Sequence, residues 1–356
     1  MTERGDLPRV AILATGGTIA GTGETPGESR YATAVLGVEE LLEEIPRVED
    51  LAVLEGEEVA RVGSQDMTPA IWLGLAESTR RWLARGDVAG LVVTHGTDTL
   101  EETAFFLDLV LGTEVPVVVT GAMRPATGVS ADGPRNLLDS VRVVVDPQAR
   151  NRGVLVVLDE SIHTARGVTK TNTANVSTFQ SPDLGAAGVI VAGRPVFFRP
   201  AASTLGRGAR FDVAGAGELP RVDVLHVCAG TAPDIVTATL DSGARGIVVA
   251  GVGNGNAPRE LLDALAGAVR AGVPVVRSSR TGSGFVARDV EVDDDAYGFV
   301  AAGDLNPAKA RVLLMLALLS TTETRQLQEL FFAPLAGAGE GAGGGARIEA
   351  KGPGVG

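Results

Sequence analysis

Short runs of consecutive apolar residues alternate, through most of the chain, with segments whose apolar positions repeat every three or four residues. The uninterrupted runs predict strands, because a strand in a parallel sheet is buried on both faces and needs no polar alternation. These runs are Val10–Ala14, Gly90–Thr94, Pro116–Thr120, Val154–Leu158, Val222–Val227, Gly246–Ala250 and Pro274–Arg277.

The periodic segments between them predict helices. Several begin with proline, whose missing N–H costs nothing in the first turn of a helix. These segments are Pro69–Ala84, Leu100–Leu111, Pro134–Val144, Pro233–Leu240 and Pro258–Ala271. Strands that alternate with helices predict an α/β protein with doubly wound sheets, flavodoxin-like or Rossmann-like in arrangement.

One segment interrupts this alternation and predicts a division into two domains. Residues 199–220 are rich in Gly, Ala and Arg, have no strong period and end in a proline, so we interpret them as a linker. We expect a larger N-terminal domain over residues 1–198 and a smaller C-terminal domain over residues 221–333, which suits a length of 356 residues. Residues 334–356 are mostly Gly and Ala, which predicts a disordered tail that the chemistry does not need.

Charge and composition exclude several classes of protein. The net charge of −13 argues against binding to nucleic acid or to an anionic membrane, which both favour a basic surface. The apolar run Val10–Ala14 is too short for a signal peptide or a membrane span. We therefore expect a cytoplasmic protein, although a secreted chain that had lost its leader would look the same. The single cysteine, Cys228, excludes an intrachain disulfide.

Polar residues that directly follow predicted strands are candidates for a functional site, because parallel α/β sheets bind ligands beyond the carboxyl ends of their strands. Three polar loops of this kind contain glycine, and they are Thr15–Gly21, Thr94–Thr99 and Gly121–Pro125. Glycine lets backbone N–H groups come close to a substrate, and threonine supplies hydroxyl groups. The phosphate-binding motifs GxxxxGK[ST] and GxGxxG are both absent.

Each loop also has a purely structural interpretation. Residues 15–18 could form a tight turn that caps a helix, and Thr97 with Asp98 could be the N-terminal cap of a helix that begins near Thr99. We expect His95 to be structural. Three histidines and one cysteine argue against a transition-metal site, so we expect neither a metal nor a cofactor.

Few residues could activate a hydroxyl nucleophile in this chain. A GxSxG motif is absent and the histidines are too sparse for a Ser-His-Asp triad, so a lysine, a tyrosine or a carboxylate must act. The lysines are Lys170, Lys309 and Lys351, and we expect the second on an exposed helix and the third in the tail. Lys170 lies in a loop of Thr and Asn residues at the same sheet edge. There it could take a proton from a threonine such as Thr97 and later return it, beside Asp98.

Two blocks together resemble the bacterial-type L-asparaginase family, and most closely its secreted, high-affinity branch. The blocks are Ile12–Gly21 and Val93–Glu102, and each follows a predicted strand. The resemblance extends over residues 9–331 through Gly63–Met67, Gly121–Pro125, Ser130–Pro134, Val168–Thr173, Gly251–Asn256, Arg277–Arg280, Gly298–Val300 and Leu305–Leu313. It implies an amidohydrolase that converts L-asparagine to L-aspartate and ammonia without a cofactor.

The resemblance also implies roles for individual residues. Thr18 would be the nucleophile that forms an acyl-enzyme, beside Tyr31 and beside Glu291 from a neighbouring subunit. A second group that activates water or relays a proton would consist of Thr97, Asp98 and Lys170. The residues implied in substrate binding are Gly17, Ser64, Gln65, Thr97, Asp98, Ala122, Asn256 and Glu291. The implied assembly is a homotetramer of close dimers whose sites are shared across the dimer contact.

Three alternative functions stay open. A glutaminase-asparaginase of broad specificity would accept L-glutamine, whose extra methylene changes binding by only about 1–3 kcal/mol; Asn256 favours a preference for asparagine. The ammonia-releasing subunit of a tRNA-dependent amidotransferase uses related motifs, but it would need an N-terminal extension and a partner. A non-catalytic amino-acid sensor would be expected to lack the nucleophile or Lys170.

Overall fold

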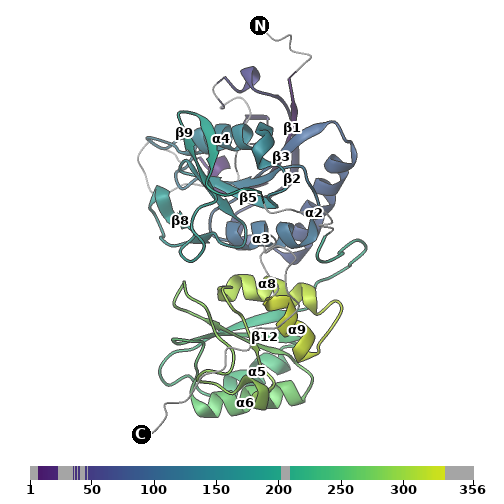
Figure 1. Cartoon of the computed structure of the whole chain (residues 1–356), viewed down its shortest axis with the longest axis vertical. Helices are drawn as coiled ribbons and strands as arrows, with labels where there is room; N and C mark the ends of the chain where they lie inside the picture. Colours follow the sequence, from purple (N-terminus) through teal and green to yellow (C-terminus); the bar gives the residue numbers. More distant parts are fainter. Residues whose placement is uncertain are drawn as a thin grey trace.

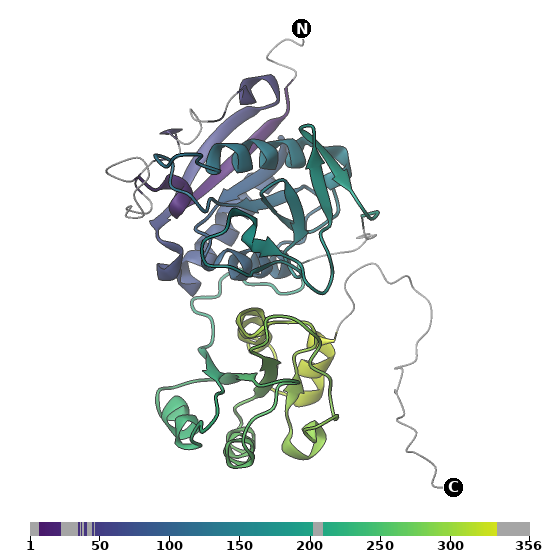
Figure 2. The same cartoon turned by 90° about the vertical axis from the view of Figure 1, so that its left-hand side faces the viewer.

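The structure is a computed structural model that describes residues 7–22, 35, 37, 39–40, 45, 47–201 and 209–332. These residues form two α/β units, with the larger one above the smaller in Figure 1, and the view in Figure 2 shows the same separation. No helix in this part of the chain is long and apolar enough to cross a membrane.

The larger unit contains one eight-stranded sheet, a two-stranded sheet and three α-helices among the described residues. Its strands are β1 (Arg9–Gly16), β2 (Val53–Val62), β3 (Val88–Thr94), β4 (Val117–Thr120), β5 (Val154–Leu158), β6 (Ser161–Thr164), β7 (Thr169–Lys170), β8 (Phe179–Gln180), β9 (Gly188–Val191) and β10 (Arg194–Phe197). Its helices are α2 (Pro69–Ala84), α3 (Leu100–Val110) and α4 (Gly133–Val145).

The smaller unit contains a four-stranded sheet. Its strands are β11 (Val222–His226), β12 (Gly246–Gly251), β13 (Val275–Ser279) and β14 (Val300–Ala301). Its helices are α5 (Asp234–Asp241), α6 (Arg259–Arg270), α7 (Asp294–Tyr297), α8 (Pro307–Ala317) and α9 (Thr324–Phe331). The two-domain α/β fold predicted from the sequence is confirmed.

The strand order of the larger sheet brings two strand ends together where the connections change direction. The order is β10-β9-β6-β5-β4-β3-β1-β2, and the neighbours from β5 to β2 are parallel. From β1 the chain passes outward to β2 and then back across β1 to β3, as in flavodoxin-like sheets. The carboxyl ends of β1 and β3 therefore lie side by side at the position where such folds bind ligands.

Strand β1 shows why the central strands are continuously apolar. Ala11 and Leu13 face the core formed with α2 and α3, whereas Val10 and Ile12 face the core formed with α4. All four are fully buried, because successive residues of a strand point to opposite faces and helices cover both faces. The continuous apolar runs thus identify strands that are covered on both sides.

In the larger sheet, the strands that the apolar runs did not predict lie toward the edges; the short strands β7, β8 and β14, in the other two sheets, were not predicted either. Strand β2 is an edge strand of mostly half-exposed residues with three glutamates, so it carries no continuous apolar run. Strands β6, β9 and β10 form an antiparallel extension at the other edge. The parallel pairing is confirmed for the centre of the sheet. Short edge strands lack a distinctive pattern because one side of each is left partly exposed.

The smaller sheet has a sequential strand order, β11-β12-β13-β14, and its neighbours are all parallel. Helices α5 and α6 pack on the face that carries Ile247 and Val249, and α8 packs on the face that carries Val248. The order of these described strands never reverses. The reversal that creates a ligand position therefore occurs in the larger unit.

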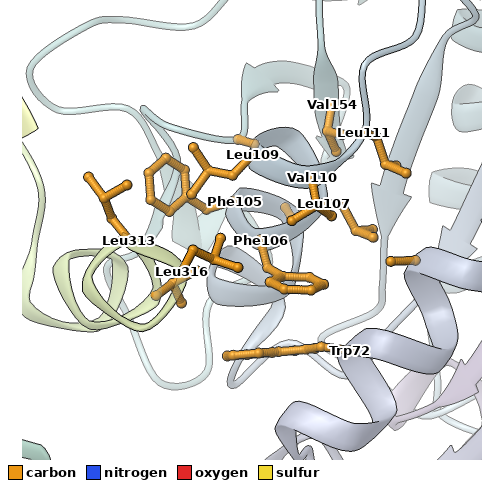
Figure 3. Packing of buried hydrophobic residues seen from close by; sticks show 14 of the residues in the cluster. Trp72, Phe105, Phe106, Leu107, Leu109, Val110, Leu111, Val154, Leu313 and Leu316 are labelled. Carbon is orange, nitrogen blue, oxygen red and sulfur yellow. The ribbon is translucent and has the colours of Figure 1, made fainter. Parts of the chain in front are cut away.

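The hydrophobic core continues from one unit to the other where α3 meets α8. In Figure 3, Leu313 and Leu316 of α8 point toward Phe105 and Phe106 of α3, and all four side chains are at most 1% exposed. The ring of Trp72 stacks on Phe106 with their centroids 5.3 Å apart. This apolar contact joins the middle of α3 and the second half of α8 in one core.

The expectation that Lys309 lies on an exposed helix is wrong. Helix α8 is covered by the larger unit, and Lys309 is only 2% exposed. Its Nζ donates hydrogen bonds to the carbonyl oxygens of Arg166, at 2.9 Å, and of Val168. Burial lowers the pKa of Lys309 to about 8, because a charged amine is poorly stabilised away from water.

The predicted linker falls between the last strand of the larger unit and the first of the smaller one. Strand β10 ends at Phe197 and β11 begins at Val222. Residues 202–208 of this segment and the whole of the expected tail, 334–356, lie outside the described residues. The boundaries of the two domains stay a prediction.

Candidate active site

Two glycine-containing turns meet at the ends of β1 and β3 and pack backbone against backbone. Gly17 follows β1 with a φ of 85°, in the left-handed region that glycine adopts without strain. A Cβ at this position would lie 2.3 Å from the Cα of Gly96, which follows β3. Only glycine permits this approach, and it brings Thr18 and Thr97 to a single site.

Ser64 connects the end of β2 to the same site. It begins the 3-10 helix Ser64–Asp66 directly after β2. Its Oγ accepts a hydrogen bond from the backbone N of Asp98 at 3.1 Å, and its carbonyl oxygen accepts one from Thr99 Oγ1 at 2.8 Å. A serine hydroxyl that accepts from a backbone N–H can still donate its own proton, so Ser64 can bind an anionic group of a ligand.

Thr97 and Asp98 contact Lys170 and do not cap α3, so their interpretation as a helix cap is wrong. The N-cap residue of α3 is Thr99. The Nζ of Lys170 donates to Thr97 Oγ1 at 2.9 Å and to Asp98 Oδ1 at 2.6 Å. The side chain of Lys170 is 15% exposed and that of Asp98 is 62% exposed. The amine is therefore sheltered, while the carboxylate reaches the surface.

A cavity of about 260 Å³ opens between these turns. It is smaller than the roughly 300–1,000 Å³ of pockets for drug-sized ligands, so it suits a molecule the size of an amino acid. Its lining residues are Gly17, Thr18, Ser64, Gln65, Gly96, Thr97, Asp98, Met123, Lys170 and Thr173. Within the part of the chain that the structure describes, no group of three or more His, Cys, Asp or Glu residues could hold a metal ion.

The loop that follows β4 is tied to the start of α4. The carboxylate of Asp132 accepts hydrogen bonds from the backbone N of Met123 at 3.0 Å and of Arg124 at 2.8 Å. Met123 lines the cavity, whereas the side chain of Ala122 is fully buried in a small cluster with Ile19. Ala122 can therefore contribute to a ligand only through its backbone.

His95 is a structural residue, as expected. Its Nδ1 lies 2.7 Å from the carbonyl oxygen of Gly96, which can only accept, so Nδ1 carries the proton. Its Nε2 then accepts from Thr103 Oγ1 at 2.8 Å, and that hydroxyl accepts from Trp72 Nε1 at 2.8 Å. Burial lowers the pKa of His95 to about 4, so the ring is neutral and supports the turn at Gly96.

Asn256 and Glu291 lie together in the smaller unit and do not line this cavity. The Nδ2 of Asn256 donates to Glu291 Oε2, and Glu291 is exposed. The residues that line the cavity all belong to the larger unit. Tyr31 lies outside the described residues.

Four residues at or beside the site received no role from the sequence. Gly96, Met123 and Thr173 line the cavity, and their signals were their place in polar loops after predicted strands and in segments that share the family resemblance. Glu101 accepts a hydrogen bond from the backbone N of Lys170 at 2.7 Å. A glutamate in the first turn of a helix is usually a solvated partner of the helix dipole, so the sequence did not distinguish it.

Both units are similar to those of known proteins. The family model "Asparaginase, N-terminal" matches residues 9–203, and the model "Glutaminase/Asparaginase C-terminal domain" matches residues 221–331. The chain is 47% identical to L-asparaginase 2 of Escherichia coli (strain K12) over 325 residues. This alignment covers 91% of this chain and 93% of that protein. It is 40% identical to the glutaminase-asparaginase of Acinetobacter glutaminasificans, covering 91% and 98% of the two chains. A solved structure of a probable cytoplasmic L-asparaginase from Campylobacter jejuni has a TM-score of 0.87 and 43% identity, covering 91% and 99%.

The backbone contact at Gly17 predicts a large effect of a single methyl group. We expect Gly17→Ala to lower the free energy of unfolding by about 2–4 kcal/mol, because the new Cβ would overlap Gly96 and the backbone would be strained. Denaturant unfolding measures the change. Gly74→Ala is the matched control, since Gly74 lies inside α2 with no atom within 4 Å of an added Cβ. It should stabilise the protein by about 0.5–1 kcal/mol, and equal effects at both positions would contradict the contact.

Two buried histidines predict how stability depends on pH. Burial lowers the pKa of both His95 and His163 from 6.5 to about 4. Between these pH values the unfolded chain binds protons that the native protein does not, so stability decreases as the pH falls from 6.5 to 4. We expect His163→Gln to reduce the slope of unfolding free energy against pH in this window by about 1.4 kcal/mol per pH unit.

Denaturant unfolding at several pH values across this window measures the slope. His226→Gln is the control, because His226 is exposed, and the slope should stay unchanged. A similar change in both variants would mean that the burial of His163 is not the cause.

Proposed function

The chain belongs to the asparaginase family, and from this premise we propose that it is an L-asparaginase, which hydrolyses L-asparagine to L-aspartate and ammonia. One observation carries the proposal. In a cavity of about 260 Å³, threonine hydroxyls meet a lysine amine and a carboxylate. These groups supply a nucleophile, a proton carrier and an anchor for an ammonium group.

Thr18 is the proposed nucleophile, with Tyr31 and a partner subunit's glutamate, the residue corresponding to Glu291, beside it. Its Oγ attacks the carbon of the side-chain amide and gives up its proton. The departing nitrogen gains a proton and leaves as ammonia, and an aspartyl ester of Thr18 remains. Water then hydrolyses the ester, which releases L-aspartate and restores the hydroxyl. Backbone N–H groups in the turns at Gly17 and Ala122 can stabilise the oxyanion by about 3 kcal/mol for each donor.

Thr97, Asp98 and Lys170 form the proposed proton relay. The 2.9 Å between Lys170 Nζ and Thr97 Oγ1 lets a proton pass between them while the heavy atoms stay in place. Asp98 holds the amine at 2.6 Å from its other side. Thr97 can therefore activate the attacking water and later recover the proton through Lys170.

The zwitterionic ends of the substrate require groups of opposite character. The exposed carboxylate of Asp98 suits the α-ammonium group, and the hydroxyl of Ser64 can donate to the α-carboxylate. Gln65 lines the same cavity. Asn256 is the proposed additional contact from a neighbouring chain.

We place these sites in a homotetramer built from close dimers. Asn256 and Glu291 contact each other in the smaller unit, whereas the cavity of the same chain is lined by residues of the larger unit. Residues with a role in substrate binding that lie apart from the cavity of their own chain would act in the cavity of a second chain.

The proposed location is the cytoplasm. A chain with Cys228 as its single cysteine makes no intrachain disulfide, and the similar structure from Campylobacter jejuni is described as cytoplasmic. Both observations support this location.

A broad glutaminase-asparaginase is the second candidate, which the similarity to the Acinetobacter protein supports. The two candidates are separated by comparing kcat/KM for asparagine with kcat/KM for glutamine. A pocket that rejects the extra methylene of glutamine would favour asparagine by about 1–3 kcal/mol, whereas a broad enzyme would show similar values for both substrates. An amino-acid sensor would bind asparagine without releasing ammonia, and an amidotransferase subunit would need a partner for turnover.

Substitution of the nucleophile and of the relay tests the chemistry. We expect Thr18→Ala and Lys170→Met each to lower kcat for ammonia release from asparagine by at least about a thousandfold, because a hydroxyl attack needs both the nucleophile and its proton carrier. Thr324→Ala is the control, since the Thr324 hydroxyl donates to Gly298 O in the smaller unit and kcat should not change. No turnover by the native chain would refute the enzyme, and full activity of Thr18→Ala would refute the nucleophile.

Mixed oligomers test whether sites are shared between chains. Thr18→Ala and Glu291→Ala should each be nearly inactive alone. In a mixed close dimer one site combines both changes and the other is intact, so a refolded equimolar mixture should regain about a quarter of the native activity. Co-refolding with an excess of either variant should lower this fraction. A mixture that stays inactive would show that each chain completes its own site.

A further inference from the structure

Helix α8 of the smaller unit begins against the strand that carries Lys170. Asn306 is the N-cap residue of α8, and its Nδ2 donates to Glu101 Oε1 at 2.8 Å. The other oxygen of this carboxylate, Oε2, accepts from the backbone N of Lys170 at 2.7 Å. Glu101 is only 8% exposed. One buried carboxylate therefore joins the smaller unit to the backbone of the residue that contacts Thr97.

Other side chains at the start of α8 hold the same segment. The Nζ of Lys309 donates to the carbonyl oxygens of Arg166 and Val168. The guanidinium of Arg166 makes a bidentate ion pair with Asp304, with N–O distances of 2.9 and 2.5 Å. The smaller unit thus binds the carbonyl oxygens of Arg166 and Val168 and the side chain of Arg166, in the segment that leads directly into Lys170.

Burying these charged and polar groups costs desolvation free energy, so stability alone does not explain why they join the two domains. Lys309 is 2% exposed, and burial lowers its pKa to about 8. Apolar residues of similar volume often replace buried charges without loss of stability. Hydrogen bonds differ from apolar contacts because they fix direction, and here they are directed at the backbone that carries Lys170.

We propose that Asn306 and Glu101 are positioning residues for Lys170, which hold its backbone so that Nζ stays within reach of Thr97 and Asp98. The proposal rests on the proposed role of Lys170 as a proton carrier. A lysine side chain has four flexible carbons, so the position of its amine depends on where its backbone is anchored. A misplacement of about 1 Å in a reacting group can cost a hundredfold in rate. The smaller unit therefore acts on the site of its own chain.

The positioning role can be tested by exchanging the donor and the acceptor of the Asn306–Glu101 hydrogen bond. Asn306→Asp keeps the Oδ1 that caps the helix by accepting from the backbone N of Lys309 at 3.0 Å, but it puts a second carboxylate against Glu101. In Glu101→Gln, the amide cannot accept from both Asn306 and Lys170. In the double variant, the amide at position 101 can donate to the carboxylate at position 306 while its oxygen still accepts from Lys170.

We expect each single variant to lower kcat for asparagine about tenfold or more, with KM changed less than about twofold and the pH profile of kcat shifted. The double variant should recover most of this loss, as coupled positions do. Arg311→Gln is the control on the same helix, where Nε donates to Val222 O and Nη1 lies 3.7 Å from Glu102. It should lower thermal stability and leave kcat unchanged. If like charges prevent folding, Asn306→Ser keeps a helix cap but is too short to reach Glu101.

Native kcat in both single variants would overturn the inference, provided that the native chain turns over asparagine and Lys170→Met does not. A double variant whose loss is the product of the single losses would also overturn it. If the native chain releases no ammonia, the proposed function fails, and the positioning of Lys170 is then tested by a measurement that does not depend on turnover. The rate at which an acylating reagent modifies Lys170, followed by mass spectrometry, should rise about threefold in the single variants and return in the double variant. Equal rates in all variants would overturn the positioning role.

Discussion

The contact between the backbones of Gly17 and Gly96 is the constraint on which the site depends. The two turns end neighbouring parallel strands, β1 and β3, at the point where the strand order reverses. A side chain at position 17 would overlap the opposite backbone, with its Cβ at 2.3 Å. Because both turns can touch, Thr18 and Thr97 line one cavity. The neutral ring of His95 supports the second turn, and both of its nitrogens are occupied by hydrogen bonds to Gly96 and Thr103.

The two domains have different tasks at this site. The larger one supplies the cavity and the groups that line it. The smaller one contributes apolar packing through α8, which Figure 3 shows. It also contributes hydrogen bonds from Asn306 to the carboxylate of Glu101 and from Lys309 to the backbone carbonyl oxygens just before Lys170. The apolar contact stabilises the association of the domains without direction, whereas the hydrogen bonds at Asn306 and Lys309 orient a particular strand. Apolar packing thus supplies most of the stability of the domain contact, and the hydrogen bonds fix the position of one domain relative to the strand that carries Lys170.

Much of this architecture could be predicted because local patterns reflect local burial. Helix α2 has the predicted bounds, Pro69–Ala84, and each continuous apolar run overlaps a strand of one of the two main sheets. The edge strand β2 was missed because its polar residues face solvent. Lys309 was placed on the surface because its neighbours in sequence do not reveal that another domain covers them. Thr97 and Asp98 were considered as a helix cap because their position just before a helix is typical of one.

The sequence by itself determined the class of fold, the polar loops at the strand ends, and the presence of Thr18, Thr97, Asp98 and Lys170 in those loops. Their chemistry follows from residue type and from their place after a strand, which are both local properties. Only the tertiary structure decided that Glu101 binds the backbone of Lys170 and Asn306 at once, and that Lys309 is buried against the larger unit. Periodicity reports which face of an element is buried. It contains no information about which distant element covers that face, because that choice depends on how whole layers pack.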